Sequence, residues 1–249
     1  MAKVKLGEVA REYKSTVKAA ANLPIVGLEH LTPGQVELTQ WSEDADNTFT
    51  KGFKKGQMLF GRRRAYLKKA ALAPFDGICS GDITVIEAIP ERIMPELLPF
   101  VIQNDSLFDY AVEKSAGSLS PRVKWEHLKN YVFELPEMEY QRALVDLLWA
   151  MTRTKKAYQE LVKKTDELVK SQFIEMFGDY ISNSKGWPIA AFDEFASIDA
   201  NMTTDYEKYA DYPHIGIDSI EKDTGILSGY RTVKEDNVIS GKYVFTKDG

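Results

Sequence analysis

The sequence has one cysteine, Cys79, and three histidines. A lone thiol cannot close a disulfide within the chain or form a paired-cysteine metal site, and it is typical of a reducing compartment. Because His30, His127 and His214 are far apart in the sequence, we expect neither a metal site nor a histidine general base. Cys79 lies in an apolar stretch and is expected to be a small core residue.

Long hydrophobic runs are also missing. No charge-free segment approaches the ~18 residues that a membrane span needs, and the first residues are too polar for a signal peptide, so we expect a cytoplasmic protein without membrane contact. The sequence contains no glycine-rich loop ending in Gly-Lys-Ser or Gly-Lys-Thr, no Asn/Asp-Pro-Pro-aromatic motif of amino-methyltransferases, and no paired acidic motif of common nucleases. From these absences we expect no catalytic residues, no bound metal and no cofactor, although an autonomous enzyme stays as a third reading.

The formal net charge of -5 is unevenly distributed. Residues 179–249 contain 13 acids and 7 bases. In contrast, Lys51–Ala70 contains eight bases and no acid. Such a local basic segment is compatible with nucleic-acid binding although the whole chain is acidic.

A long helix is predicted from Leu135 to Gly178. Pro136 suits a first helical turn, and no Gly or Pro follows before Gly178, which is expected to form a left-handed cap. About 40 residues at 1.5 Å each give a rod of roughly 60 Å. Its apolar residues recur at spacings of three and four: Leu144, Leu147, Leu148, Met151, Tyr158, Leu161, Val162, Leu168, Val169, Phe173, Met176 and Phe177. The stripe favours a coiled coil over a helix that crosses the core of one large domain.

An internal repeat flanks this helix, with offsets of 185 to 191 residues. The matched blocks are 6–10 with 192–196, 23–31 with 212–220, and 55–60 with 240–245. They predict a first recognition domain at 1–134, a spacer helix at 135–178, and an incomplete second domain at 179–249. We expect the chain to be shortened within its second domain, or to pair with a second copy of itself.

The first copy combines strands and helices without regular alternation, which indicates an α+β globule. We expect a short helix or turn at 6–12, a helical region at 95–114 that Pro99 disturbs, and a helical turn at 125–130. Strands are expected at 24–31, 57–61, 70–73, 83–87 and 131–134.

Two segments are candidates for DNA contact. In the first, Met58–Lys69, a strand that continued through the arginines would place Arg62 and Arg64 on one face and Arg63 on the other. The second, Ser115–Lys124, offers hydroxyl groups, backbone amides and two cations. The alternative for both segments is an ordinary solvent-exposed surface that does not contact DNA. Charge and position select as DNA-binding candidates Lys54, Lys55, Arg62, Arg64, Tyr66, Lys68, Ser118 and Arg122.

Three passages together resemble the specificity subunits of type I restriction-modification enzymes. They are Gly56–Glu87, which contains Leu-Phe-Gly-Arg, Arg-Ala-Tyr-Leu and Phe-Asp-Gly-Ile-Cys-Ser-Gly; Ala116–Leu128, which contains Gly-Ser, Arg and Trp-Glu-His-Leu; and Leu135–Gln141, with Leu-Pro, an acid and Gln. The order of target domain, long helix and second target domain is also that of the family. The end of the sequence at Gly249, where the first copy has its arginines, departs from it.

The resemblance implies a non-catalytic DNA-recognition subunit that reads half of a bipartite site on double-stranded DNA. It further implies that the long helix docks modification subunits, that a restriction (motor-nuclease) subunit joins them, and that S-adenosylmethionine, ATP and Mg²⁺ belong to those partners. The alternative is an assembly protein that self-pairs, or binds a modification subunit, without productive DNA recognition.

Overall fold

The structure, a computed structural model, describes residues 2–17, 23–43, 48–117, 119–198, 200–222 and 224–245. The chain divides into two compact units, Met1–Lys170 and Ser171–Gly249, and each is described by itself. Short strands and helices occur with one 40-residue helix, so the predicted α+β class with a long helix is confirmed. Within the described ranges, none of the helices combines the length and the apolar character that a membrane span requires.

Strand β5 (Met58–Gly61) is the centre of the first unit, and all four of its residues are buried. It pairs antiparallel with β8 (Ile83–Ala88) and β6 (Ala70–Leu72), and β2 (Ala10–Glu12) completes a four-stranded sheet in the order β2-β8-β5-β6. Three of the predicted strands, at 57–61, 70–73 and 83–87, are thereby confirmed.

Both faces of this sheet are covered. Met58 and Phe60 pack against α1 (Leu6–Val9), α2 (Leu98–Ile102) and α3 (Asp105–Glu113). Leu59 points to the opposite face, as alternation along a strand requires, and packs on a second core. That core belongs to a three-stranded sheet of β3 (Ile25–Val26), β7 (Gly77–Cys79) and β4 (Lys51–Phe53), in the order β3-β7-β4. Cys79 is fully buried in it, as predicted.

Several element boundaries differ from the prediction. The expected strand at 24–31 is only β3, followed by a 3₁₀ helix, η1 (Leu28–His30). The expected helical region at 95–114 is two helices, because the Asn104 side chain accepts a hydrogen bond from the Ser106 N–H and caps α3. Helix α4 (Trp125–Leu128) follows, and β9 (Val132–Leu135) pairs antiparallel with an unpredicted strand, β1 (Ala2–Lys5).

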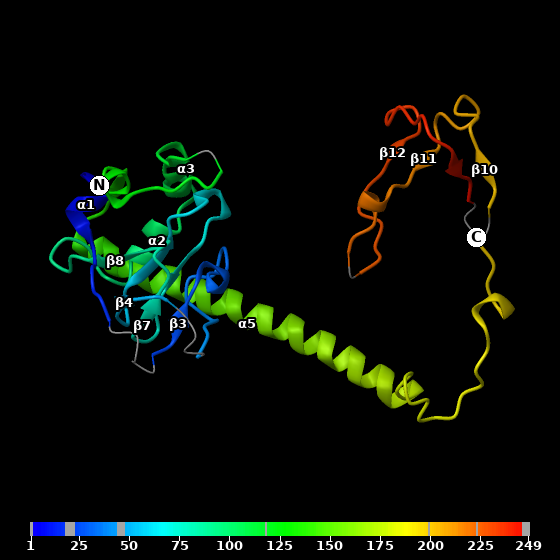
Figure 1. The fold of residues 1–249 in the computed structure, drawn as a ribbon, viewed down its shortest axis with the longest axis horizontal. Helices are drawn as coiled ribbons and strands as arrows, with labels where there is room; N and C mark the ends of the chain where they lie inside the picture. Colours follow the sequence, from blue (N-terminus) through cyan, green and yellow to red (C-terminus); the bar gives the residue numbers. More distant parts are fainter. Residues whose placement is uncertain are drawn as a thin grey trace. The chain divides into compact units, whose positions relative to one another are not determined.

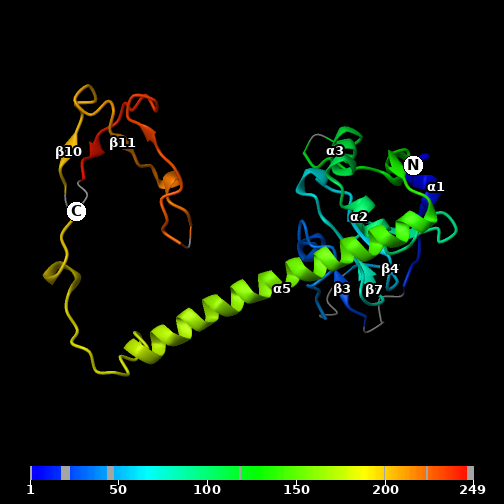
Figure 2. The same cartoon turned by 180° about the vertical axis from the view of Figure 1, so that it is seen from behind.

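The long helix α5 extends from Met138 to Phe177. Gly178 ends it at φ +82°, and its N–H donates to the Ile174 carbonyl at 2.8 Å. The predicted helix and its left-handed glycine cap are confirmed. In Figures 1 and 2 the first half of α5 lies along the globular part of the first unit.

Gln141 fastens the start of α5 to the first unit. Its side chain is 1% exposed. The Gln141 Oε1 atom accepts a hydrogen bond from the Met94 N–H at 2.9 Å, while Nε2 donates to the Pro136 carbonyl at 2.9 Å. Two turns later, the Trp149 indole donates to the Glu96 carbonyl at 3.0 Å and contacts Phe100 edge to face. These contacts fix the helix to the globule over its first three turns.

Further along α5 the apolar stripe is exposed. Between Tyr158 and Met176, more than half of the surface of each of these stripe residues is exposed to solvent: Tyr158, Leu161, Val162, Leu168, Val169, Phe173 and Met176. A helix that left this stripe in water would forgo the hydrophobic contribution of these side chains. Pairing with another helix therefore stays a prediction.

The repeat is confirmed in local backbone structure. The Lys5 N–H donates to Glu8 Oε2 at the start of α1, and 186 residues later the Ala191 N–H donates to Glu194 Oε1 at the start of η3 (Phe192–Glu194). The same type of residue performs the same capping role in both units.

A second repeated device lies at the 3₁₀ helices. The Gly27 N–H donates to His30 Nδ1, and the Gly216 N–H donates to Ser219 Oγ at η4 (Ile217–Ser219), 189 residues later. His30 therefore has a capping role that a serine performs in the other copy. The preceding residues repeat as well, because the Ile25/Ser42 bridge corresponds to the pair His214/Arg231 between β11 (Pro213–His214) and β12 (Arg231–Thr232).

Burial is not repeated. In the first unit, Leu6 and Val9 are 0% and 2% exposed, whereas their counterparts Phe192 and Phe195 are 68% and 69% exposed. The second unit contains two further short strands, β10 (Met202–Thr203) and β13 (Lys242–Tyr243), which pair with each other. Its described residues carry the local turns of the first unit without the helices and central sheet that cover them there.

Replacing Gln141 by leucine is expected to lower the free energy of unfolding of the first unit by about 1–3 kcal/mol, because the Met94 N–H and the Pro136 carbonyl lose their buried partner. Chemical denaturation monitored by tryptophan fluorescence measures this. Gln172→Leu, an exposed position on the same helix, is the control and should change stability by no more than about 0.5 kcal/mol. Equal effects of the two substitutions would show that the buried hydrogen bonds of Gln141 do not stabilise the first unit.

Candidate nucleic-acid interface

The two segments predicted to contact DNA lie side by side. The Arg64 N–H donates to the Pro121 carbonyl at 2.8 Å, and the Val123 N–H donates to the Arg62 carbonyl at 3.0 Å. An isolated bridge also pairs Arg63 with Arg122. The structure thus brings the backbones of Arg62, Arg64 and Arg122 together in the first unit, although about 60 residues separate the two segments in the sequence.

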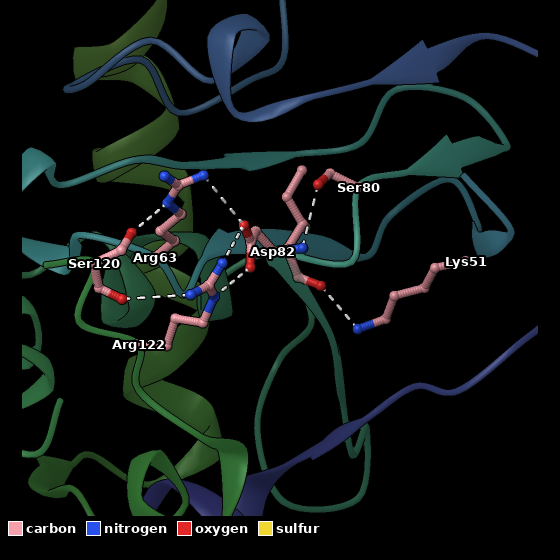
Figure 3. A network of polar contacts seen from close by, with 7 residues as sticks. Lys51, Arg63, Ser80, Asp82, Ser120 and Arg122 are labelled. Carbon is pink, nitrogen blue, oxygen red and sulfur yellow. Dashed lines mark hydrogen bonds and ion pairs between the residues drawn. The ribbon is translucent and has the colours of Figure 1, made fainter. Parts of the chain in front are cut away.

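An aspartate lies at the centre of this surface. Arg122 binds Asp82 in bidentate fashion, with Nε at 2.7 Å from Oδ1 and Nη2 at 3.1 Å from Oδ2. Arg63 Nη1 is 3.7 Å from Asp82 Oδ2, and Arg63 Nε donates to the Ser120 hydroxyl. Figure 3 shows the two guanidinium groups on the same carboxylate. The hydrogen bond from Arg122 holds the pKa of Asp82 below its ordinary value.

The main chain determines where Asp82 lies. It precedes β8 in a tight turn, where its N–H donates to the Ser80 hydroxyl at 3.2 Å. Its carbonyl accepts the Arg62 N–H at 2.9 Å, so the turn is bonded to the end of β5. On the other side, Lys51 Nζ donates to the Ile83 carbonyl at 2.8 Å, and burial lowers the pKa of Lys51.

The expected alternation of the arginines is wrong. Strand β5 ends at Gly61, and Arg64 has a left-handed backbone at φ +53°. A 3₁₀ helix, η2 (Ala65–Leu67), follows and is closed by Lys68, also left-handed at φ +50°. Period-two alternation holds only within an extended strand, so it does not assign Arg62 and Arg64 to a common face. Tyr66 on η2 is 55% exposed.

Much of the predicted basic segment has acidic partners. Lys54 Nζ is 2.8 Å from Asp76, whose other oxygen accepts the Lys55 N–H. Lys68 Nζ is 2.6 Å from Asp105. These ion pairs raise the pKa of both lysines, and Asp82 adds a third acid. The excess of positive charge is therefore smaller than the sequence of Lys51–Ala70 suggested.

The predicted residues do not form one contiguous cluster. Lys54 and Lys55 lie before β5, whereas Arg62 and Arg64 follow it. Lys68 lies beyond η2 and is paired with α3 through Asp105. Ser118 lies outside the described residues. The sequence did not single out Arg63 or Asp82 as site residues. The feature that could have identified Asp82 is its position directly before a strand that pairs with β5.

Three further features of this part of the first unit concern exposure, burial and possible metal ligands. The Leu119 side chain, at the tip of the 115–124 loop, is 91% exposed. Among the described residues, the Arg62 Nε atom is buried without a hydrogen-bond partner. In the same part of the chain, no group of three or more His, Cys, Asp or Glu side chains could hold a metal ion.

Comparison with known proteins found one related sequence and several related structures. No protein-family model matches the chain. The chain is 25% identical, over 126 residues, to the type I restriction enzyme EcoDI specificity subunit of Escherichia coli; the match covers 47% of this chain and 27% of that protein.

Three solved structures share the fold. The HsdS subunit from Thermoanaerobacter tengcongensis is 23% identical with a TM-score of 0.52, and the match covers 81% of this chain and 52% of that one. The S subunit of a type I restriction-modification system from M. genitalium is 11% identical with a TM-score of 0.52, covering 81% and 50%. A structure from work on assembly and conformational transition of the type I R-M system is 20% identical with a TM-score of 0.54, covering 81% and 52%. The chain spans about half the length of these structures.

Asp82 makes the stability of the first unit depend on pH. Because its folded pKa is depressed, its ion pair stabilises the fold above the unfolded pKa, near 3.8, and this contribution is lost as pH falls through the lower folded value. Asp82→Asn is expected to destabilise the unit at neutral pH and to cost progressively less below about pH 4. Urea denaturation across this pH range measures the difference.

Asp146→Asn is the matched control, because the Asp146 side chain is exposed and has no hydrogen bond or ion pair within the described residues. Its effect should be small throughout the pH range. A cost of Asp82→Asn that stays constant down to the acid limit would contradict the ion-pair assignment.

Proposed function

We propose that the chain is a DNA-recognition subunit of the type I restriction-modification kind, on the premise of its sequence similarity to a type I restriction enzyme specificity subunit and of the fold that it shares with S-subunit structures. Its first unit would read one half of a bipartite double-stranded site. The observation that supports this proposal is the surface where Arg62, Arg63, Arg64 and Arg122 meet. The bidentate guanidinium group suits both phosphate oxygens and guanine edges.

We propose three functional parts. Residues 1–134 form the first target recognition domain, 135–178 the spacer helix, and 179–249 the beginning of a second target recognition domain. The glycine-capped helix and the repeated turns on either side of it support this division. A helix of roughly 60 Å is long enough to separate half-sites one DNA turn apart, which lie about 34 Å from each other.

The partners follow from the same proposal. Modification subunits would dock on α5 and supply S-adenosylmethionine and the methyl-transfer chemistry, and a restriction subunit would supply ATP-dependent movement and Mg²⁺-dependent cleavage. Our chain would contribute recognition and spacing and carry no catalytic residues. The long exposed stripe on α5 supports docking there.

The same stripe favours one alternative. If α5 pairs with the α5 of a second copy, the chain could be an assembly protein that forms dimers or captures a modification subunit without reading DNA. Apolar side chains at coiled-coil spacing support self-pairing as well as they support docking. Measurements of DNA binding and of oligomeric state distinguish the two functions.

The proposed function predicts that the purified chain selects a sequence from a pool of duplexes with a randomised centre. Replacing Arg62 and Arg64 together by alanine should weaken binding to selected and scrambled duplexes alike. It should also reduce the slope of log affinity against log salt by about one for each lost phosphate contact. Fluorescence anisotropy at two salt concentrations measures both effects.

Replacing Lys163 and Lys164 by alanine removes the same charge from α5 and is the control. Sequence selection by the unmodified chain would support the recognition function. Absence of selection, together with unchanged affinity of the arginine variant, would refute it.

Self-pairing predicts a dimer in multi-angle light scattering. Leu168→Glu, in the stripe, is expected to raise the dimer dissociation constant at least about tenfold, because burial of a leucine contributes about 1.5–3 kcal/mol. Ser171→Glu adds the same charge three residues away, outside the stripe, and should leave the dimer intact. A chain that is monomeric at all accessible concentrations would leave the stripe to another partner.

A further inference from the structure

Arg63 and Arg122 differ in how much of each guanidinium group is already bound. Arg122 has Nε and Nη2 on Asp82, and its Nη1 is 3.4 Å from the Ser120 carbonyl. Each of its three nitrogen atoms therefore has a partner within the protein, although its side chain is 40% exposed. The bidentate ion pair gives Arg122 a structural role on this surface, beside the DNA contact for which its charge and position made it a candidate.

Arg63 is held on one side only. Nε donates to the Ser120 hydroxyl, and Nη1 lies 3.7 Å from Asp82 Oδ2, which is ion-pair range but beyond hydrogen-bond distance. Neither Nη1 nor Nη2 makes a hydrogen bond within the described residues, so the Nη1/Nη2 edge is the one left for a ligand. Its side chain is 40% exposed. Arg63 thus combines a fixed plane with a free donor edge, as Figure 3 illustrates.

The neighbouring arginines lack this combination. Arg62 has its Nε buried, and its backbone N–H and carbonyl are bonded to Asp82 and Val123. Arg64 is exposed, and its side chain has no hydrogen bond or ion pair among the described residues. An unconstrained arginine loses side-chain entropy when it binds, which suits it to phosphate contact better than to discrimination between bases.

We infer that Asp82 is a positioning residue for sequence recognition, which together with Ser120 orients Arg63 so that its free edge can bind the O6 and N7 acceptors of a guanine. This inference rests on the proposed function and names the specificity-determining residue. Guanine is the base whose major-groove edge offers two adjacent acceptors to an arginine fork.

The negative charge of Asp82 indicates that this residue orients Arg63 and does not serve to attract DNA. A carboxylate on a DNA-binding surface repels phosphate, so an acid at its centre weakens non-specific affinity. Removing it should therefore strengthen non-specific binding. If Asp82 also orients Arg63, the same removal should weaken discrimination, and the two effects have opposite signs.

The test compares Asp82→Asn with Asp76→Asn in the full chain. Both variants lose one carboxylate that is paired with a cationic side chain, but Asp76 binds Lys54 and has no contact with Arg63 among the interactions of the described residues. Each protein is incubated with the randomised duplex pool, and affinities are then measured for the enriched duplex and for a scrambled duplex. We expect both variants to bind the scrambled duplex as tightly as the unmodified chain or more tightly.

Only Asp82→Asn should lower the ratio of the two affinities, by about tenfold or more, the range that one bidentate base contact provides. An unchanged ratio for Asp82→Asn, or an equal loss for Asp76→Asn, would overturn the inference. Whether the unmodified chain enriches a sequence from the duplex pool tests the proposed function separately. If it enriches none, both the proposed function and the inference fail.

A second pair of variants covers the case in which Asp82→Asn does not fold, as judged by circular dichroism and thermal unfolding. Arg63→Lys keeps the charge but loses the planar fork, and Arg64→Lys is its matched control at the next residue. The Arg63 variant should lose discrimination at guanine positions of the enriched sequence. An Arg63→Lys variant that selects the same sequence with the same ratio would overturn the inference.

Discussion

Burial of β5 on both faces is the constraint on which the first unit depends. Met58 and Phe60 belong to one core and Leu59 to the other, so the strand cannot shift register without exposing both sets of side chains. Its partner β8 begins directly after Asp82, and the Arg62 N–H is bonded to the Asp82 carbonyl. The position of the arginine cluster is therefore fixed by the central strand pair, and the surface inherits the rigidity of the core.

Because its side chains are held in place, the basic segment Lys51–Ala70 has different binding properties from those that its charge alone suggests. In the sequence the segment is a run of positive charge, and counterion release would be its main contribution to DNA binding. In the fold, Asp76, Asp82 and Asp105 neutralise part of the run and hold individual cations in place. The surface consequently attracts DNA less strongly without regard to sequence, and its hydrogen-bond donors have a more defined geometry. Both properties suit a protein that distinguishes between DNA sequences.

The helix and the repeat could be predicted from the sequence because both depend on local patterns. The spacing of apolar residues and the position of Gly178 determine α5, and Glu8 and Glu194 cap their turns from three residues away. The arrangement of the site could not be predicted, since Arg122 and Asp82 are 40 residues apart and meet only through the sheet. The alternation of Arg62 and Arg64 failed because the chain leaves the strand at Gly61.

The repeat also separates the parts of the fold that are local from the parts that need a core. Gly216 and Ser219 reproduce the turn of Gly27 and His30, although Ile217 is 93% exposed. The turn therefore has its capping bond and its backbone hydrogen bond from the Ser219 N–H to the Gly216 carbonyl without being buried. A His-to-Ser change is tolerated at that cap because either side chain can accept the glycine N–H. Residues shared by the two copies thus specify the scaffold, whereas Arg63, Asp82 and Arg122 belong to the surface that we propose to read DNA.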